Sequence, residues 1–192
     1  MGGKLIVVGG LPGSGKTKVG KELSRRIENA IFLDKDTLSR SFVEEMLVLL
    51  ESTKDDRESK KYLERVRPLE YDVMMKQALE NVELGKTAIL SAPFIKELYS
   101  QDWVENLIVD VELNDAELHL VWVTCSIDTM KNRLIDREAS RDSWKINHWY
   151  EYIKSLPVAP PPIDELHIFM NDSGAGNCID ESISLLIGKI TG

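Results

Sequence analysis

The chain has 192 residues, with 24 Lys or Arg against 32 Asp or Glu and a formal net charge of −8. This length suits one sizeable core and is short for two, so we expect a single domain over residues 1–192. The acidic balance argues against a long nucleic acid or an anionic membrane as partner.

The two cysteines form no disulfide framework and no zinc motif. No apolar run reaches the ~18 residues needed to span a bilayer, and the N-terminus lacks a signal-peptide layout. We therefore expect a cytoplasmic location, and we infer no obligate protein partner.

Five short apolar runs rich in β-branched residues predict buried strands, because apolar side chains fill both faces of each run. The runs are residues 5–8, 30–33, 87–90, 118–124 and 166–170. Helical patterns lie between the strands and after the last one. Their apolar positions are Val19, Leu23 and Ile27; Leu38, Phe42, Met46 and Leu49 or Leu50; Val73, Met74, Ala78 and Val82; and Ile179, Ile183, Leu186 and Ile187. The alternation predicts a parallel sheet covered by helices on both faces, and the charged stretch 51–61 is interpreted as an exposed connection.

The first strand runs into Gly10-Leu-Pro-Gly-Ser-Gly-Lys-Thr17, which matches G-x-x-x-x-G-K-[ST] between a predicted strand and a predicted helix. Glycines let successive backbone N–H groups face a phosphate, and the helix N-terminus adds partial positive charge. We expect Lys16 to reach the β and γ phosphates of a nucleoside triphosphate and Thr17 to hold Mg²⁺. Further nucleotide contacts are assigned to Gly10, Pro12, Gly13, Ser14, Gly15 and Lys18.

Two carboxylates follow the second strand, in FLDKDTLSR, at the edge of the sheet where doubly wound folds bind ligands. A carboxylate there accepts the proton of an attacking hydroxyl or helps to order Mg²⁺. We favour Asp36 as the base and assign Asp34 to the metal, although the residues leave open which of the two is the base. The alternative is that Asp36 or Thr37 caps the following helix.

Ser91 ends the third strand, where many phosphate-binding-loop proteins carry an acidic residue linked to Mg²⁺. No typical acid is visible there. The Ser-Ala-Pro loop that follows is a candidate wall of an acceptor pocket, and Lys96 is an optional phosphate contact. Alternatively, Pro93 simply ends the strand.

After the fourth strand, Arg133, Arg137 and Arg141 recur every four residues, on one face of a helix or its frayed end. They predict a mobile lid over residues 131–143 that neutralises charge on the transferring phosphoryl group. We assign catalysis to Arg133 and Arg137 and nucleotide contacts to Arg137 and Arg141; the alternative is a solvated face. Ser173 and Gly174, after the fifth strand, are expected to contact the nucleotide base, or else form a turn.

Four segments together resemble the P-loop kinase-type ATP-binding proteins, the group that includes gluconate kinase, chloramphenicol phosphotransferase, zeta toxin and polynucleotide kinase. They are GGLPGSGKT, LDKDTL, LSAPFIKELY and REASRDSWKINHWYEYIKSL, the last of which looks like uncharacterised bacterial ATP-binding proteins of this group. The resemblance implies a three-layer α/β/α fold with a five-stranded parallel sheet of order 2-3-1-4-5 and a helical lid. It also implies Mg·ATP as donor and Asp36 as base. The gluconate-kinase lid sequence itself is absent.

The residues and the resemblance favour an ATP-dependent phosphotransferase that moves the γ-phosphate to a hydroxyl of a small molecule. The nearest alternative is a polynucleotide or nucleoside kinase. An alternative of another class is an ATP-binding regulatory module with slow hydrolysis.

Overall fold

The computed structural model describes residues 2–157, 159–172 and 178–191. At its centre is a parallel five-stranded sheet with the order β2-β3-β1-β4-β5, which confirms the expected order. Its strands are β1 Lys4–Gly10, β2 Ala30–Asp34, β3 Thr87–Ser91, β4 Glu117–Thr124 and β5 His167–Met170. Each predicted strand coincides with one of these to within two residues at either end.

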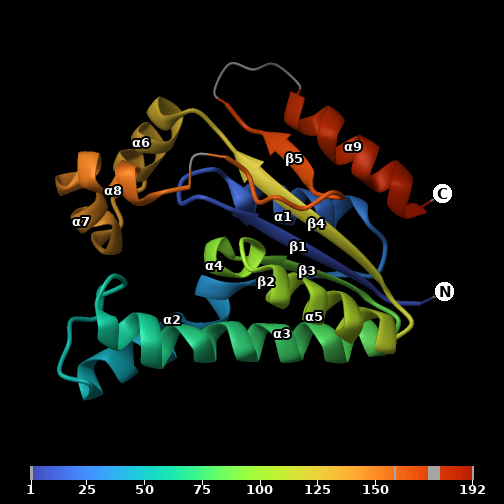
Figure 1. The fold of residues 1–192 in the computed structure, drawn as a ribbon, viewed down its shortest axis with the longest axis horizontal. Helices are drawn as coiled ribbons and strands as arrows, with labels where there is room; N and C mark the ends of the chain where they lie inside the picture. The colour runs from blue at the N-terminus through green and yellow to red at the C-terminus, as the bar shows by residue number, and fades with distance from the viewer. Residues whose placement is uncertain (1, 158, 173–177, 192) are drawn as a thin grey trace.

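Helices cover both faces of the sheet (Figure 1). Those of the first half are α1 Lys16–Arg26, α2 Lys35–Leu49, the π-helix η1 Tyr62–Val66, α3 Arg67–Glu83, α4 Ile95–Leu98 and α5 Gln101–Leu113. Those of the second half are α6 Ile127–Asp136, the 3₁₀ turn η2 Ser140–Asp142, α7 Ser143–Asn147, α8 Trp149–Ser155 and α9 Cys178–Thr191. No helix among these described residues is long and apolar enough to cross a bilayer.

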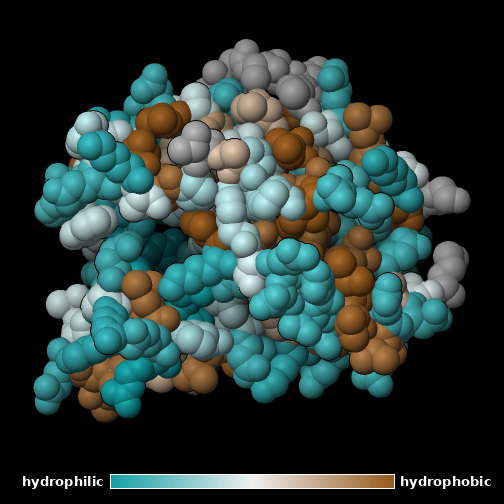
Figure 2. Space-filling view, viewed as in Figure 1, coloured by the Kyte–Doolittle hydropathy of each residue, from teal (hydrophilic) through white to brown (hydrophobic). Residues whose placement is uncertain are grey.

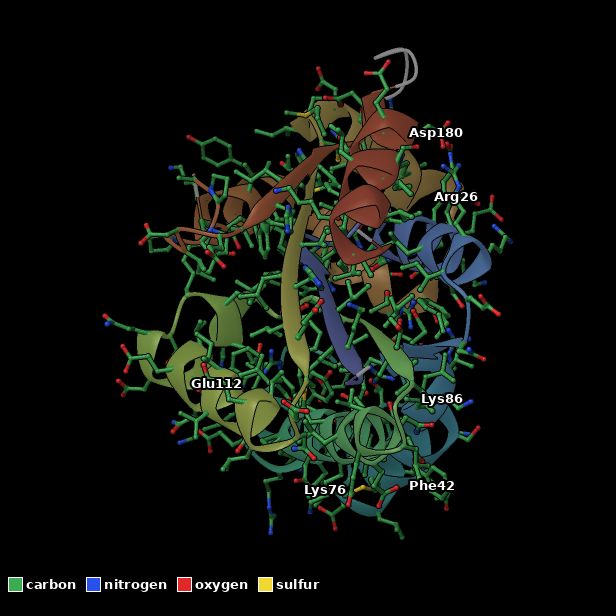
Figure 3. All side chains as sticks on the ribbon, turned by 90° about the vertical axis from the view of Figure 1, so that its right-hand side faces the viewer. Arg26, Phe42, Lys76, Lys86, Glu112 and Asp180 are labelled. Carbon is green, nitrogen blue, oxygen red and sulfur yellow. The ribbon has the colours of Figure 1, made fainter. Side chains whose placement is uncertain are left out.

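The central strand β1 supplies side chains to two separate cores. Leu5 and Val7 join the cluster beneath α3 and α5, whereas Ile6 and Val8 join the cluster beneath α1 and α9. Because both faces are buried, the strand reads as a continuous apolar run. Figure 3 shows Arg26 of α1 and Asp180 of α9 close together at the molecular surface, and these two side chains form an ion pair at 2.9 Å.

The helix α2 is present, but only part of its predicted buried face is confirmed: Met46 and Leu50 pack against the core cluster, whereas Leu38, Phe42 and Leu49 are exposed. Phe42 and Leu49 are each 75 % exposed, and Figure 3 shows Phe42 on the outer side of the molecule. Val43 and Leu47 are buried instead, against η1. The helix carries two apolar stripes, and the stripe that packs against η1 includes the polar positions Lys35 and Ser39.

Candidate active site

The phosphate-binding loop bends between the end of β1 and the start of α1. Gly15 caps α1 with a φ of +97°, in the region that favours glycine, and a Cβ there would lie 2.1 Å from Nδ2 of Asn171. At the other end of the bend, the Gly10 N–H donates to the carbonyl of Pro93, at 3.1 Å. The glycines are therefore required both for the turn and for the close approach of a neighbouring side chain.

Two residues from distant parts of the chain brace this loop. Asn171, which follows β5 and is only 6 % exposed, donates Nδ2 to the carbonyl of Ser14 at 2.6 Å. Arg133 of α6 donates to the carbonyls of Gly13, Ser14 and Asn171 at 3.3, 3.2 and 2.8 Å. These hydrogen bonds brace the loop from α6 and from the end of β5. The guanidinium of Arg133, predicted to be catalytic, contacts main-chain carbonyls here.

Lys16 is buried at the first position of α1, only 8 % exposed, and its Nζ donates to the carbonyl of Leu11 at 2.8 Å. Burial, reinforced by the nearby charge of Arg137, lowers the pKa of Lys16 to about 8. Among the described residues, the charges of Asp36 and Asp34 favour the ammonium but do not offset its desolvation. A bound phosphate would supply further negative charge.

This depressed pKa makes nucleotide affinity depend on pH. An anionic phosphate raises the pKa of Lys16 in the complex, so binding takes up a proton once the pH exceeds about 8. We expect ATP affinity to be greatest below pH 8 and to fall by up to about tenfold per pH unit above it. Titration calorimetry at pH 9 in buffers of different ionisation enthalpy measures the uptake. Equal heats in all buffers, after correction for ATP itself, would contradict this assignment.

Three oxygen-bearing side chains meet beside Lys16. The Thr17 hydroxyl donates to Oδ2 of Asp34 at 3.0 Å and lies 3.5 Å from Oγ of Ser91. Carboxylate and hydroxyl oxygens are ligands that Mg²⁺ accepts, so this set, drawn from α1, β2 and β3, fits the ion implied by the family resemblance.

Asp34 also caps α2, because its Oδ1 accepts a hydrogen bond from the Thr37 N–H at 3.1 Å. The alternative that Asp36 or Thr37 is the cap is wrong, since α2 begins at Lys35, two or three residues earlier than that alternative requires. Asp34 therefore has a structural role as the N-cap of α2. Asp36, the second residue of the helix, is not its cap.

Asp36 is held between two cations. Its carboxylate lies 2.9 Å from Nη2 of Arg141 and 3.3 Å from Nζ of Lys35. Burial favours a higher pKa, but Lys35 and Arg141 outweigh it and lower the pKa of Asp36 below its ordinary value. The side chain is thus an ionised carboxylate at neutral pH.

Lys35 is fixed in turn by a buried carboxylate on α3. Oε1 of Glu70 accepts from Lys35 Nζ and from the Ser39 hydroxyl, each at 2.7 Å, and Oε2 accepts from the Tyr62 hydroxyl at 2.7 Å. A buried carboxylate with three donors is well satisfied. The π-helix η1 presents Tyr62 to this network, and π-helical turns are frequent at functional sites.

The three arginines of the predicted row have three different partners. α6 ends at Asp136, with Arg137 as its C-cap, and Glu138 has a φ of +49°. Arg133 and Arg137 therefore lie on the helix and at its end, as predicted, whereas Arg141 lies beyond it in η2. Arg133 braces the phosphate-binding loop, Arg137 pairs with Asp142 through Nε at 2.9 Å, and Arg141 reaches Asp36. That residues 131–143 form a mobile lid stays a prediction.

These groups surround a cavity of about 430 Å³. It opens between the phosphate-binding loop, the α6–α8 side and the connection from α2 to α3, where Figure 2 shows a hollow with hydrophilic residues in its depth. Two contacts join the connection between α2 and α3 to the segment from η2 to α7: Lys145 Nζ lies 2.8 Å from Glu58, and the Ser140 hydroxyl donates to Asp55 at 2.6 Å. These contacts could not be predicted from the sequence, because stretch 51–61 has the composition of an ordinary exposed connection.

The predicted nucleotide contacts are distributed around this cavity. Its lining includes Pro12, Lys16, Thr17, Arg137 and Arg141. Gly10, Gly13, Ser14 and Gly15 form the bend behind them, and Lys18 is exposed on α1. Ser173 and Gly174 lie outside the described residues. Asp34, Asp36, Ser91, Pro93 and Lys96 also line the cavity.

The family model described as an AAA domain matches residues 5–155. No curated protein matches the chain. Solved structures do, and the sheet order and the matched P-loop kinase structures agree with the group expected from the sequence.

Three of these structures show the range of the similarity. Kti12 from Chaetomium thermophilum, in complex with ADP-AlF3, is 16 % identical, with 98 % of this chain and 100 % of that one covered and a TM-score of 0.64. A gluconokinase from Sinorhizobium meliloti 1021 is 15 % identical, covers 97 % and 95 %, and has a TM-score of 0.57. Shikimate kinase from Bacteroides thetaiotaomicron is 18 % identical, covers 97 % and 98 %, and has a TM-score of 0.55. At these identities the likeness concerns the fold.

Proposed function

The chain belongs to the AAA domain family, and from this premise we propose that it is an ATP-dependent phosphotransferase acting on a hydroxyl of a small molecule. The observation that carries the proposal is an ionised carboxylate, Asp36, that lines the same cavity as Lys16 and Thr17. ATP hydrolysis alone needs no acceptor room. A cavity of about 430 Å³ that holds both a phosphate-binding loop and a base suits transfer to a second substrate.

The bend and α1 bind the phosphate donor, ATP. The backbone N–H groups of the loop and the Lys16 ammonium bind the phosphates, and the braces from Arg133 and Asn171 keep the bend in shape. Thr17 and Asp34 would hold Mg²⁺, which neutralises phosphate charge when bound. Burial strengthens each of these attractions, because water screens them less.

Asp36 serves the acceptor side. Its carboxylate takes the proton of the acceptor hydroxyl while the acceptor oxygen bonds to the γ-phosphorus and the bond to the ADP oxygen breaks. For this, Arg141 has to release Asp36, with which it forms an ion pair. Arg141 and Arg137, which line the same cavity as Lys16, then help to offset the charge of the transferring group.

The pair between Asp36 and Arg141 also favours a second candidate, an ATP-binding regulatory module with slow hydrolysis. If the pair persists with nucleotide bound, the base stays occupied and no acceptor is phosphorylated. The two functions differ in whether an acceptor accelerates ATP consumption.

ATP consumption with and without pools of sugars, sugar acids, antibiotics, nucleosides and oligonucleotides tests the proposal. We expect one pool of small molecules to raise the rate and a phosphorylated product to appear in it by mass spectrometry. Stimulation by oligonucleotides alone would favour a polynucleotide kinase. A rate that no pool changes would favour the regulatory module.

The arginines give a further expected result. Arg137→Ala should lower turnover by ~10²-fold, because it removes a cation from the charge that develops in transfer. Arg133→Ala should instead raise the KM for ATP and lower the melting temperature, since its partners are carbonyls of the loop.

Arg65→Ala is the matched control, because Arg65 is exposed on η1 and does not line the cavity. Steady-state kinetics and thermal melts on the three variants separate the roles. If Arg133→Ala and Arg137→Ala both keep the wild-type rate and KM, the row is a solvated face.

A further inference from the structure

The charge of the cavity differs from that of the chain. The described residues that line it include eight cations but only four acids, although the whole chain has a net charge of −8. The cavity thus holds a third of all Lys and Arg residues and an eighth of all Asp and Glu residues. Phosphates of a nucleotide account for some of this excess, and the partners of each cation show which ones remain.

Most of the cations already have a carboxylate partner, and Lys16 belongs to the phosphate-binding loop. The paired cations are Lys35 with Glu70, Arg67 with Glu97, Arg137 with Asp142, Arg141 with Asp36 and Lys145 with Glu58. Among the described residues, this leaves Arg57 and Lys96 as lining cations without a carboxylate partner.

Arg57 lies in the connection between α2 and α3. Its Nη1 donates to the carbonyls of Lys54 and Asp56, at 2.9 and 2.8 Å, and its guanidinium lies 5.3 Å from the ring centroid of Tyr62. These contacts orient the guanidinium without neutralising it. Lys96, exposed on α4 after the loop that follows β3, brings a second uncompensated charge to the same cavity.

The acids of the cavity are all engaged. Asp36, Glu58 and Asp142 each face a cation, and Asp34 accepts hydrogen bonds from Thr17 and Thr37. A cationic acceptor, such as an amino sugar, would therefore find no spare carboxylate among the described lining residues, and its ammonium group would meet uncompensated positive charge.

One polar atom in the lining also lacks a partner. Tyr152 of α8 is only 5 % exposed, and its buried hydroxyl makes no hydrogen bond with the described residues. A buried hydroxyl without a partner is costly, so the site is suited to a ligand oxygen or a water at this position. The α8 side thus adds a neutral hydrogen-bonding group to the two cations.

We propose that the acceptor is a hydroxylated molecule bearing an anionic group, a carboxylate or a phosphate, which binds Arg57 and Lys96 with the help of Tyr152. This rests on the proposed function and deepens it by naming the substrate class. The planar fork of an arginine suits both anions. Held there, the molecule spans the cavity toward Asp36. Neutral polyols and amino sugars lack the anionic group, so they should bind this site more weakly.

Matched acceptors test the proposal in the wild-type enzyme. ATP consumption is measured with glucose, gluconate, glucose 6-phosphate and glucosamine, and with ribose, ribonate, ribose 5-phosphate and ribosamine. We expect at least tenfold higher kcat/KM for an anionic member than for its neutral and cationic counterparts. The acid and phosphate arms identify the anion. Greater activity with the neutral or cationic members would overturn the proposal.

A binding experiment reads the anion site without turnover. Inorganic phosphate is titrated by calorimetry into protein saturated with a non-hydrolysable Mg·ATP analogue, and into Lys16→Met, in which the phosphate-binding loop is impaired. We expect both to bind phosphate, and Arg57→Gln/Lys96→Gln to bind it at least tenfold more weakly. Lys54→Gln/Lys60→Gln, which changes two exposed lysines of the same connection, is the control and should bind as the wild type does.

The results separate the two proposals. If no acceptor of any charge stimulates ATP consumption but phosphate binding depends on Arg57 and Lys96, the phosphotransferase is wrong and the anion site stands. If phosphate does not bind, or binds equally to Arg57→Gln/Lys96→Gln, the anion site is wrong whatever the enzyme does. Arg57→Lys, which keeps the charge and loses the fork, serves if the double variant fails to fold.

Discussion

Lys16→Met is expected to lower ATP turnover by at least ~10²- to 10³-fold, the range seen when one preorganised charge or donor is removed from a transition state. The Lys16 ammonium is buried beside the bend, where it donates to the carbonyl of Leu11, and its pKa is lowered to about 8. Methionine keeps the apolar stem and removes the charge. Coupled-assay kinetics and a thermal melt on the same preparation measure the loss.

The fold should survive this change. Because burial disfavours the ammonium in the free protein, removing it should not lower the melting temperature. Lys21→Met, an exposed lysine one turn along α1, is the control and should retain turnover. Normal turnover by Lys16→Met would contradict the assignment of the bend, and a lower melting temperature would mean that Lys16 supports the fold.

The bend could be predicted from the sequence because its determinants are local. Gly15 needs a positive φ, Lys16 starts the helix, and both lie within a few residues of the strand that precedes them. The strands could also be predicted, since burial on both faces of a strand gives an uninterrupted apolar run in the sequence. Local periodicity is less decisive where a helix has two apolar stripes. In α2, packing against η1 buries Val43 and Leu47 and leaves Phe42 exposed.

The electrostatics of the site could not be predicted in this way. Lys35 and Glu70 are 35 residues apart, and Glu58 and Lys145 come from opposite sides of the cavity. Each looks like an ordinary charge in its own segment. Pairing depends on where the fold places these elements. The sequence therefore predicted Asp36 and Arg141 as site residues, but not the ion pairs of Asp36 with Arg141 and Lys35.

Asp36→Asn is expected to lower acceptor-dependent turnover by ~10²-fold or more, in line with the contribution of a general base. Asparagine has nearly the same size and cannot take the proton. The KM for ATP should change by less than about threefold, because the bend, Lys16 and Thr17 are untouched. Product formation with a saturating acceptor measures the effect.

Asp34→Asn is the matched comparison, because asparagine caps a helix about as well as aspartate and α2 should remain intact. The Asp34→Asn variant should need a higher Mg²⁺ concentration for half-maximal activity, since Asp34 accepts a hydrogen bond from Thr17 and is the expected metal ligand. Excess Mg²⁺ should recover activity for Asp34→Asn and leave Asp36→Asn unchanged. The reverse pattern would exchange the two roles.

Asp36 has one other route to an effect, through its ion pair with Arg141. If it only tethers the predicted lid, then Asp36→Asn and Arg141→Ala remove the same interaction, and the double variant should be no slower than either single one. If Asp36 is the base and Arg141 acts on the transferring phosphoryl group, the two losses should approximately multiply. A double variant that matches Asp36→Asn, together with an Arg141→Ala variant of the same rate, would remove Asp36 from the chemistry and leave it as a tether.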